Sequence, residues 1–160
     1  MGDSIALVPV MLVVSHTQTG GTRALVDALV AGARHDDIDD VTVVEVDALE
    51  ATVDHVTGSD LVVLATPENF GYMSGALKVF LDRVYYPLLE QQVRRPYQLL
   101  VKAGNDGSGA VSAVERIISG LGWPVARPPL LVVGKVGAEH LEAATELGLE
   151  LGASLDMGLL

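Results

Sequence analysis

Apolar and polar positions follow two alternating patterns along this chain. Short runs of aliphatic and β-branched residues, typical of buried strands, are separated by longer segments in which apolar residues recur at helical spacing. The central runs are almost entirely apolar, as expected when helices cover both faces of a parallel sheet. The alternation predicts an α/β fold, a doubly wound, five-stranded parallel sheet with helices on both faces. Its strands are predicted near 8–14, 41–46, 61–65, 98–103 and 130–133.

Residues that start or stop helices refine the helical predictions. Thr22 follows two glycines and is predicted to be the N-cap of the first helix. Pro87 is predicted to mark the end of a later helix, because a proline interrupts helical hydrogen bonding. Gly120 and Gly122 predict the end of the next helix. The remaining helices are expected within 47–59 and over 138–151.

Three glycine-bearing loops, 17–22, 66–72 and 103–109, follow predicted strands one, three and four. The carboxyl ends of parallel strands share one edge of the sheet, so the three loops are expected to form a ligand crevice. The first loop, T-Q-T-G-G-T, places hydroxyls and amides at a helix start, where phosphate can bind without a cation. The second offers Phe70 and Tyr72 for stacking on a flat ligand, and the third offers backbone polar groups. Each loop also has a purely structural interpretation. The first would be a capped turn, the second a loop whose aromatic residues pack on the core, and the third a flexible loop.

Composition narrows the range of partners. The chain has 160 residues, 49% of them hydrophobic, which fits a single domain spanning residues 1–160. Its 10 Lys and Arg against 21 Asp and Glu give a formal net charge of -11, so nucleic acid is not expected as a partner. The acidity suits either a solvated surface or docking of a basic protein.

Two further absences bear on location and chemistry. No apolar run reaches the roughly 18 residues of a membrane span, and no basic stretch precedes an apolar export segment. We therefore expect no membrane span and a cytoplasmic location. The chain has no cysteine, which excludes disulfides, thiolate metal sites and cysteine nucleophiles, and no metal site is expected.

Other phosphate-binding and catalytic motifs lack a residue that their chemistry requires. There is no G-x-x-x-x-G-K-[ST] loop, and no G-x-G-x-x-G follows the first strand. The third strand ends in Ala65, Thr66 and Pro67, where a receiver domain needs a phospho-accepting aspartate. Ser108 lacks the G-x-S-x-G framing of a hydrolase nucleophile. None of these motifs supplies a catalytic side chain, and none is expected.

Taken together, the three loops resemble those of flavodoxin-like FMN flavoproteins, and the resemblance covers most of the chain. T-Q-T-G-G-T resembles the FMN phosphate signature of flavodoxins. The stretch 67–83 is similar to the P-x-x-x-G-x-M-S-G-x-x-K-x-F-x-D-R pattern of flavodoxin-fold NAD(P)H-dependent oxidoreductases. The resemblance implies a flavodoxin-like strand order of 2-1-3-4-5 and noncovalent FMN, with phosphate on the first loop and the isoalloxazine between the other two. The implied cofactor-binding residues are Thr17, Gln18, Thr19, Gly20, Gly21, Thr22, Thr66, Pro67, Glu68, Asn69, Phe70, Gly71, Tyr72, Ala103, Gly104, Asn105, Asp106 and Gly109.

The third loop departs from electron-carrier flavodoxins because it has no aromatic residue to cover the flavin. An open flavin face suits hydride transfer from a nicotinamide, which favours an NAD(P)H-dependent oxidoreductase that reduces a quinone or another small acceptor. The alternative is a flavodoxin-type electron carrier that docks to a basic redox partner, and a third is a module without flavin. Arg94 and Arg95 are the candidates for a nicotinamide 2'-phosphate. The resemblance also allows a homodimer in which a neighbouring subunit completes the site.

Overall fold

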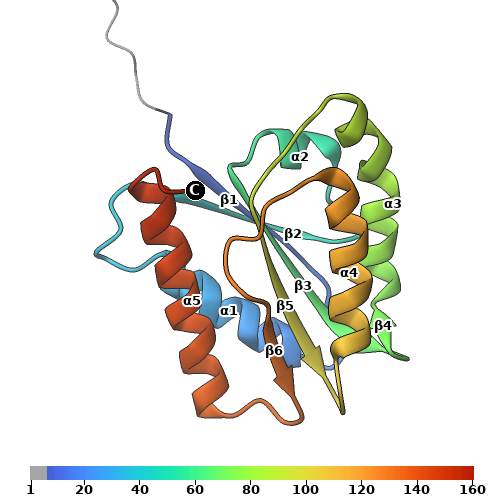
Figure 1. Ribbon diagram of the computed structural model, residues 1–160. Helices are drawn as coiled ribbons and strands as arrows, with labels where there is room; N and C mark the ends of the chain where they lie inside the picture. The colour runs from blue at the N-terminus through green and yellow to red at the C-terminus, as the bar shows by residue number, and fades with distance from the viewer. Residues whose placement is uncertain (1–6) are drawn as a thin grey trace, which may run out of the picture.

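The computed structural model describes residues 7–160 and shows one twisted sheet between two layers of helices (Figure 1). Five strands run parallel in the order β2-β1-β3-β5-β6. The predicted strand order is confirmed, since β5 and β6 are the fourth and fifth of the expected strands. The strands are β1 Val10–Ser15, β2 Thr42–Asp47, β3 Leu61–Asn69, β5 Tyr97–Ala103 and β6 Leu130–Val133.

A short strand, β4 (Tyr72–Met73), was not predicted. It turns back on the end of β3 as an antiparallel hairpin, with Asn69 opposite Tyr72 and Glu68 opposite Met73. Two residues are too few to show an alternating pattern, so periodicity gives no sign of it. The hairpin matters because it lengthens β3 past the edge of the parallel sheet.

Helices cover both faces of the sheet and bury two separate apolar cores. The helices α1 and α5 lie on one face, and α3 and α4 lie on the other (Figure 1). Alternate residues of β3 point to opposite cores: Val62 and Leu64 to the α3/α4 side, Leu61 and Val63 to the α1/α5 side. The helices are α1 Gly21–Ala33, α2 Val53–Thr57, α3 Gly75–Glu90, α4 Ser108–Leu121 and α5 Ala138–Asp156.

The predicted N-cap of the first helix is wrong. The N-cap of α1 is Gly20, at φ 93°, and no side chain caps the helix. Thr22 lies within the first turn and is only 3% exposed. A glycine in the left-handed region turns the chain sharply into the helix, so Thr22 is not needed as the capping residue.

The predicted stop at Pro87 is also wrong, because α3 continues through it to Glu90. The proline costs the helix about 3 kcal/mol. Leu88, one residue further, is completely buried, and full burial of a leucine contributes about 1.5–3 kcal/mol. The Gln91 N–H also donates to the Pro87 carbonyl at 3.0 Å. Tertiary burial at the end of α3 therefore offsets a local helix-breaking signal.

Other boundaries agree with the sequence. The short helix expected within 47–59 is α2, and α4 ends at Gly122 in the left-handed conformation. The last helix runs to Asp156, beyond the expected 151. None of the helices in residues 7–160 combines the length and apolar character that a bilayer crossing requires. The expectation about an export segment extends to residues 1–6, which lie outside the described part of the chain.

Candidate functional site

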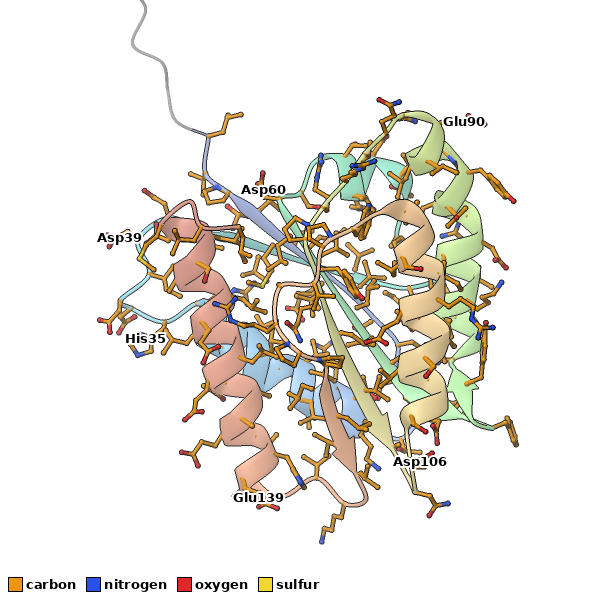
Figure 2. All side chains as sticks on the ribbon, in the orientation of Figure 1. His35, Asp39, Asp60, Glu90, Asp106 and Glu139 are labelled. Atoms are coloured by element: carbon orange, nitrogen blue, oxygen red, sulfur yellow. The ribbon has the colours of Figure 1, made fainter. Side chains whose placement is uncertain are left out.

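The three predicted loops lie together at one edge of the sheet. They follow the carboxyl ends of β1, β3 and β5, and these strands are neighbours. Ser15 at the end of β1 pairs with Ala65, while Pro67 further along β3 pairs with Lys102. Figure 2 shows Asp106, in the third loop, at the end of the sheet opposite Asp60, which precedes β3.

In the first loop, backbone amides converge on the side chain of Thr17. Its Oγ1 accepts the N–H of Gly20 at 3.1 Å and that of Arg23 at 3.4 Å. The first-turn amides of α1 have no acceptor within the helix, and a Cβ placed on Gly20 would have open space around it. An oxygen-rich anion can therefore approach the start of α1 closely.

The Arg23 side chain adjoins this loop but is held by carboxylates. Its guanidinium pairs with Glu45 at 2.6 Å and with Asp27 at 2.7 Å. Burial acts to lower the pKa of Arg23, but the hydrogen bonds that the guanidinium donates to Glu45 and Asp27 outweigh it and raise the pKa. The positive charge of Arg23 is thus largely neutralised within the protein.

Lys102 is a site residue that the sequence interpretation missed. It lies near the end of β5, and its stem reaches the start of α1: a Cβ on Gly21 would stand 3.1 Å from Lys102 Cε. The signal was present, because Lys102 is the only charged residue in the strand Y-Q-L-L-V-K-A. A lysine in a covered strand whose other residues carry no charge is expected to have a partner for its ammonium group.

The second loop is the β3–β4 hairpin, whose tip exposes its aromatic residues. Phe70 has φ 53° and a fully exposed side chain, and Tyr72 is 41% exposed. A bulky residue with positive φ is strained and uncommon. Because Phe70 packs against no part of the core, the structural explanation of this aromatic is excluded, and its ring face is available for stacking.

Thr66 and Ser74 hold the base of the same loop in place. The Thr66 hydroxyl accepts the Ser74 N–H at 2.9 Å and donates to the Pro67 carbonyl at 2.8 Å. Both side chains are fully buried, and Ser74 in turn caps α3 by accepting the Leu77 N–H. Among the implied cofactor-binding residues, Thr66 therefore has its hydroxyl committed to the loop itself.

The third loop exposes small and polar groups. Gly104, Asn105 and Asp106 are exposed, and the Ser108 hydroxyl donates to the Asp106 carboxylate. Gly109 lies against the hairpin, because a Cβ on it would stand 2.0 Å from the Gly71 carbonyl oxygen. The second and third loops are thus in direct backbone contact.

The arginines considered for a nicotinamide phosphate lie elsewhere. Arg94 and Arg95 precede β5, at the amino-terminal edge of the sheet, and the seven residues of β5 span about 23 Å. Arg95 donates to the carbonyls of Ser59 at 2.6 Å and Thr57 at 3.1 Å. This placement contradicts a role for either arginine in the loop crevice.

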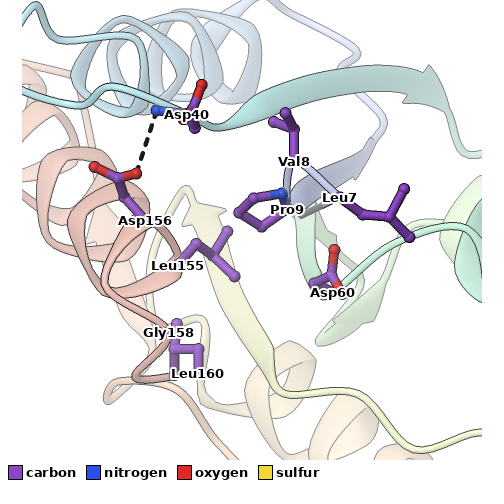
Figure 3. A pocket seen from close by; sticks show the side chains of 9 residues that line it. All are labelled: Leu7, Val8, Pro9, Asp40, Asp60, Leu155, Asp156, Gly158 and Leu160. Carbon is purple, nitrogen blue, oxygen red and sulfur yellow. Dashed lines mark hydrogen bonds between the residues drawn. The ribbon is translucent and has the colours of Figure 1, made fainter. Parts of the chain in front are cut away.

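A cavity of about 360 Å³ lies at that same amino-terminal edge (Figure 3). Two of its acidic side chains accept backbone hydrogen bonds: Asp60 accepts the Val10 N–H at 2.8 Å, and Asp156 accepts the Asp40 N–H at 3.2 Å. These bonds give the carboxylates of Asp60 and Asp156 a structural role. The loops at the carboxyl edge are the stronger candidate for a functional site.

Comparison with known proteins identifies the cofactor. The model of the NADPH-dependent FMN reductase family matches residues 10–138, which include all three loops. The chain belongs to the NADPH-dependent FMN reductase family. It is therefore an FMN-binding, flavodoxin-like redox protein. A search of curated proteins finds no match.

Solved structures support the fold of this FMN reductase family member. An archaeal flavodoxin is similar with a TM-score of 0.78 and 17% identity, over 91% of this chain and 98% of that one. A Streptococcus pneumoniae flavodoxin gives a TM-score of 0.73 and 16% identity, over 91% and 99%. The flavodiiron protein of Giardia intestinalis gives 0.76 and 19%, over 95% of this chain and 37% of its own length. At these identities the likeness concerns the fold alone.

The residues at the carboxyl edge fit FMN. At the start of α1, Thr17 Oγ1 accepts the amides of Gly20 and Arg23, and the space around Gly20 is open to a phosphate. The ring of Phe70 and the loop at Gly104 and Asn105 are exposed, so a flat heterocycle can contact either of them.

Proposed function

We propose that this protein is an NAD(P)H-dependent oxidoreductase that passes electrons through noncovalent FMN to a quinone or another small acceptor. The observation that carries the proposal is the third loop, where Gly104, Asn105 and Asp106 are exposed and no aromatic ring is present. A flavin bound beside this loop keeps one face clear for a nicotinamide. Membership of a family described by its NADPH dependence supports the same donor.

The residues proposed to hold FMN come from the three loops. The phosphate is assigned to 17–22, where the first-turn amides of α1 and the threonine hydroxyls can donate to its oxygens. The isoalloxazine is assigned to the space between Phe70 and Tyr72 on the hairpin and the backbone of 103–106. Asn105 is exposed and can bond the pyrimidine edge through its amide.

The chain's own contribution is binding, orientation and electrostatics. Bound FMN supplies a ring that accepts a hydride and returns electrons to an acceptor. The exposed Phe70 ring would exclude water from the flavin face that it covers, and Gly109 of α4 lets the hairpin lie close to that helix. The Asp106 carboxylate opposes negative charge on the ring and so lowers its reduction potential. The assigned roles require no proton transfer from a side chain.

An anaerobic reduction experiment tests the proposal. The purified protein is reconstituted with FMN, and its visible absorbance is followed after addition of NADH or NADPH without oxygen. We expect rapid bleaching of the flavin by one of the two nucleotides, followed by reoxidation on addition of a quinone. A protein that binds FMN but is bleached only when a separate reductase is added is not an oxidoreductase of this kind.

A second candidate function is one-electron carriage to a protein partner. The net charge of -11 favours it, because an acidic surface steers a basic redox partner. The same experiment separates the two functions, since a carrier accepts electrons from a reductase and not from the free nucleotide. The cytoplasmic location and the homodimer expected from the sequence remain predictions.

A further inference from the structure

Lys102 brings a positive charge to the first loop from a distant strand. The side chain lies on the α1/α5 face of the sheet, as Leu100 does two residues before it. Its stem packs against α1, with Cε 3.1 Å and Cγ 3.4 Å from where a Gly21 Cβ would stand. The residue is half-buried, so apolar contact fixes the direction of the stem while the ammonium group stays at the edge of the sheet.

The ammonium group has no carboxylate partner. Within residues 7–160 no Asp or Glu oxygen lies within 4.0 Å of Lys102 Nζ, and its one hydrogen bond goes to the Ala103 carbonyl at 3.4 Å. Arg23, which adjoins the same loop, is by contrast paired with Glu45 and Asp27. The charge of Arg23 is therefore neutralised by carboxylates, whereas the charge of Lys102 is not.

Lys102 and the start of α1 bring two positive groups to the same place. The N-terminus of a helix carries about half a unit of positive charge, and the Lys102 stem runs beside the start of α1 at Gly21. Two positive groups side by side repel each other unless an anion lies between them. The phosphate of FMN, assigned to this loop, is an anion that both groups would attract.

We propose that Lys102 pairs with the phosphate of FMN and makes the protein select FMN over riboflavin. The proposal depends on FMN being the cofactor and not on the oxidoreductase reaction. It also revises the expectation that the neutral T-Q-T-G-G-T loop binds phosphate without a cation. Because an ammonium acts as a point charge, its contribution falls as ionic strength rises.

The test compares Lys102→Met with Lys135→Met by titration of the apoprotein with FMN and with riboflavin, followed by flavin fluorescence. Methionine keeps an unbranched stem and removes the charge. Lys135 follows β6 at the same edge and is exposed, so it controls for a general loss of positive charge. We expect Lys102→Met to weaken FMN binding about 10- to 100-fold, the usual range for a hydrogen bond to a charged group, and to leave riboflavin binding unchanged. Lys135→Met should bind both as the wild type does.

Two further measurements keep the result interpretable. Inorganic phosphate should raise the thermal unfolding temperature of the wild-type apoprotein and have less effect on Lys102→Met. Lys102→Arg should recover part of the FMN affinity, because the charge is restored. An equal loss of FMN and riboflavin affinity would place Lys102 at the ring or in the general fold and overturn the proposal.

Unchanged FMN affinity in Lys102→Met would also overturn it. If the wild-type apoprotein binds neither flavin, the assignment of FMN to this crevice fails as well. No nicotinamide is present in any of these titrations, so their outcome does not depend on whether NAD(P)H reduces the protein.

Discussion

The contact between Gly109 and Gly71 allows a direct test of how the two flavin loops are held together. A methyl group added in Gly109→Ala would stand 2.0 Å from the Gly71 carbonyl oxygen and 2.8 Å from its carbonyl carbon. Both atoms belong to the backbone and cannot rotate away. To restore a contact of about 3 Å, the hairpin and α4 must separate by roughly 1 Å.

Two opposing terms decide the sign of the effect. Replacing glycine by alanine within a helix stabilises it by up to about 1 kcal/mol. Overpacking of this kind costs about 1–3 kcal/mol, so we expect Gly109→Ala to lower the free energy of unfolding by about 1–2 kcal/mol. Gly75, the first residue of α3, is a matched control because a Cβ there meets nothing within 4 Å. Gly75→Ala should therefore leave stability unchanged or raise it.

Urea unfolding of the apoproteins measures these differences, and flavin titration measures their effect on the site. Displacement of the hairpin moves Phe70 and Tyr72, so Gly109→Ala should weaken FMN and riboflavin equally, unlike Lys102→Met. Equal stability of Gly109→Ala and Gly75→Ala, with normal flavin binding, would refute the close contact between α4 and the hairpin.

Three further predictions concern the phosphate, the potential and the pH dependence of stability. Replacing Thr19 and Thr22 by Val should weaken FMN binding by about 1.5–3 kcal/mol for each hydrogen bond lost; unaltered affinity in a fluorescence titration would place the phosphate elsewhere. Asp106→Asn should raise the midpoint potential by at most about 90 mV, the shift caused by a charge about 8 Å from the ring at an effective dielectric near 20. Solvent screening of this exposed side chain reduces the shift. A lower potential in spectroelectrochemistry would contradict the prediction. Burial, with a smaller effect of Glu115, raises the pKa of Tyr97. The stability that the neutral Tyr97 side chain contributes is therefore complete below about pH 10, and it is lost as pH rises through the higher folded-state pKa. Tyr97→Phe should remove this decline in urea unfolding between about pH 8 and about pH 11.

The elements predicted correctly are those whose signal is local and repeated. The strand 61–65 is apolar at every position because both of its faces are covered, and α4 ends at a glycine because the left-handed cap requires one. The three loops were expected at one edge because parallel strands carry their carboxyl ends there. By contrast, Thr22 and Pro87 were misjudged because their local preferences were overridden, by the turn at Gly20 and by the burial of Leu88.

The details of the site that escaped prediction are contacts between segments far apart in the chain. Lys102 and Gly21 are 81 positions apart, and only the packing of β5 beneath α1 makes them neighbours. Gly109, one of the residues predicted to bind the cofactor, lies in contact with Gly71, so its lack of a side chain sets the spacing of two loops. The carboxyl edge of the sheet therefore combines residues of the T-Q-T-G-G-T motif with residues that only the fold brings near it. T-Q-T-G-G-T provides the amides for a phosphate, whereas the charge that we propose to make the site selective for that phosphate comes from the neighbouring layer of the fold.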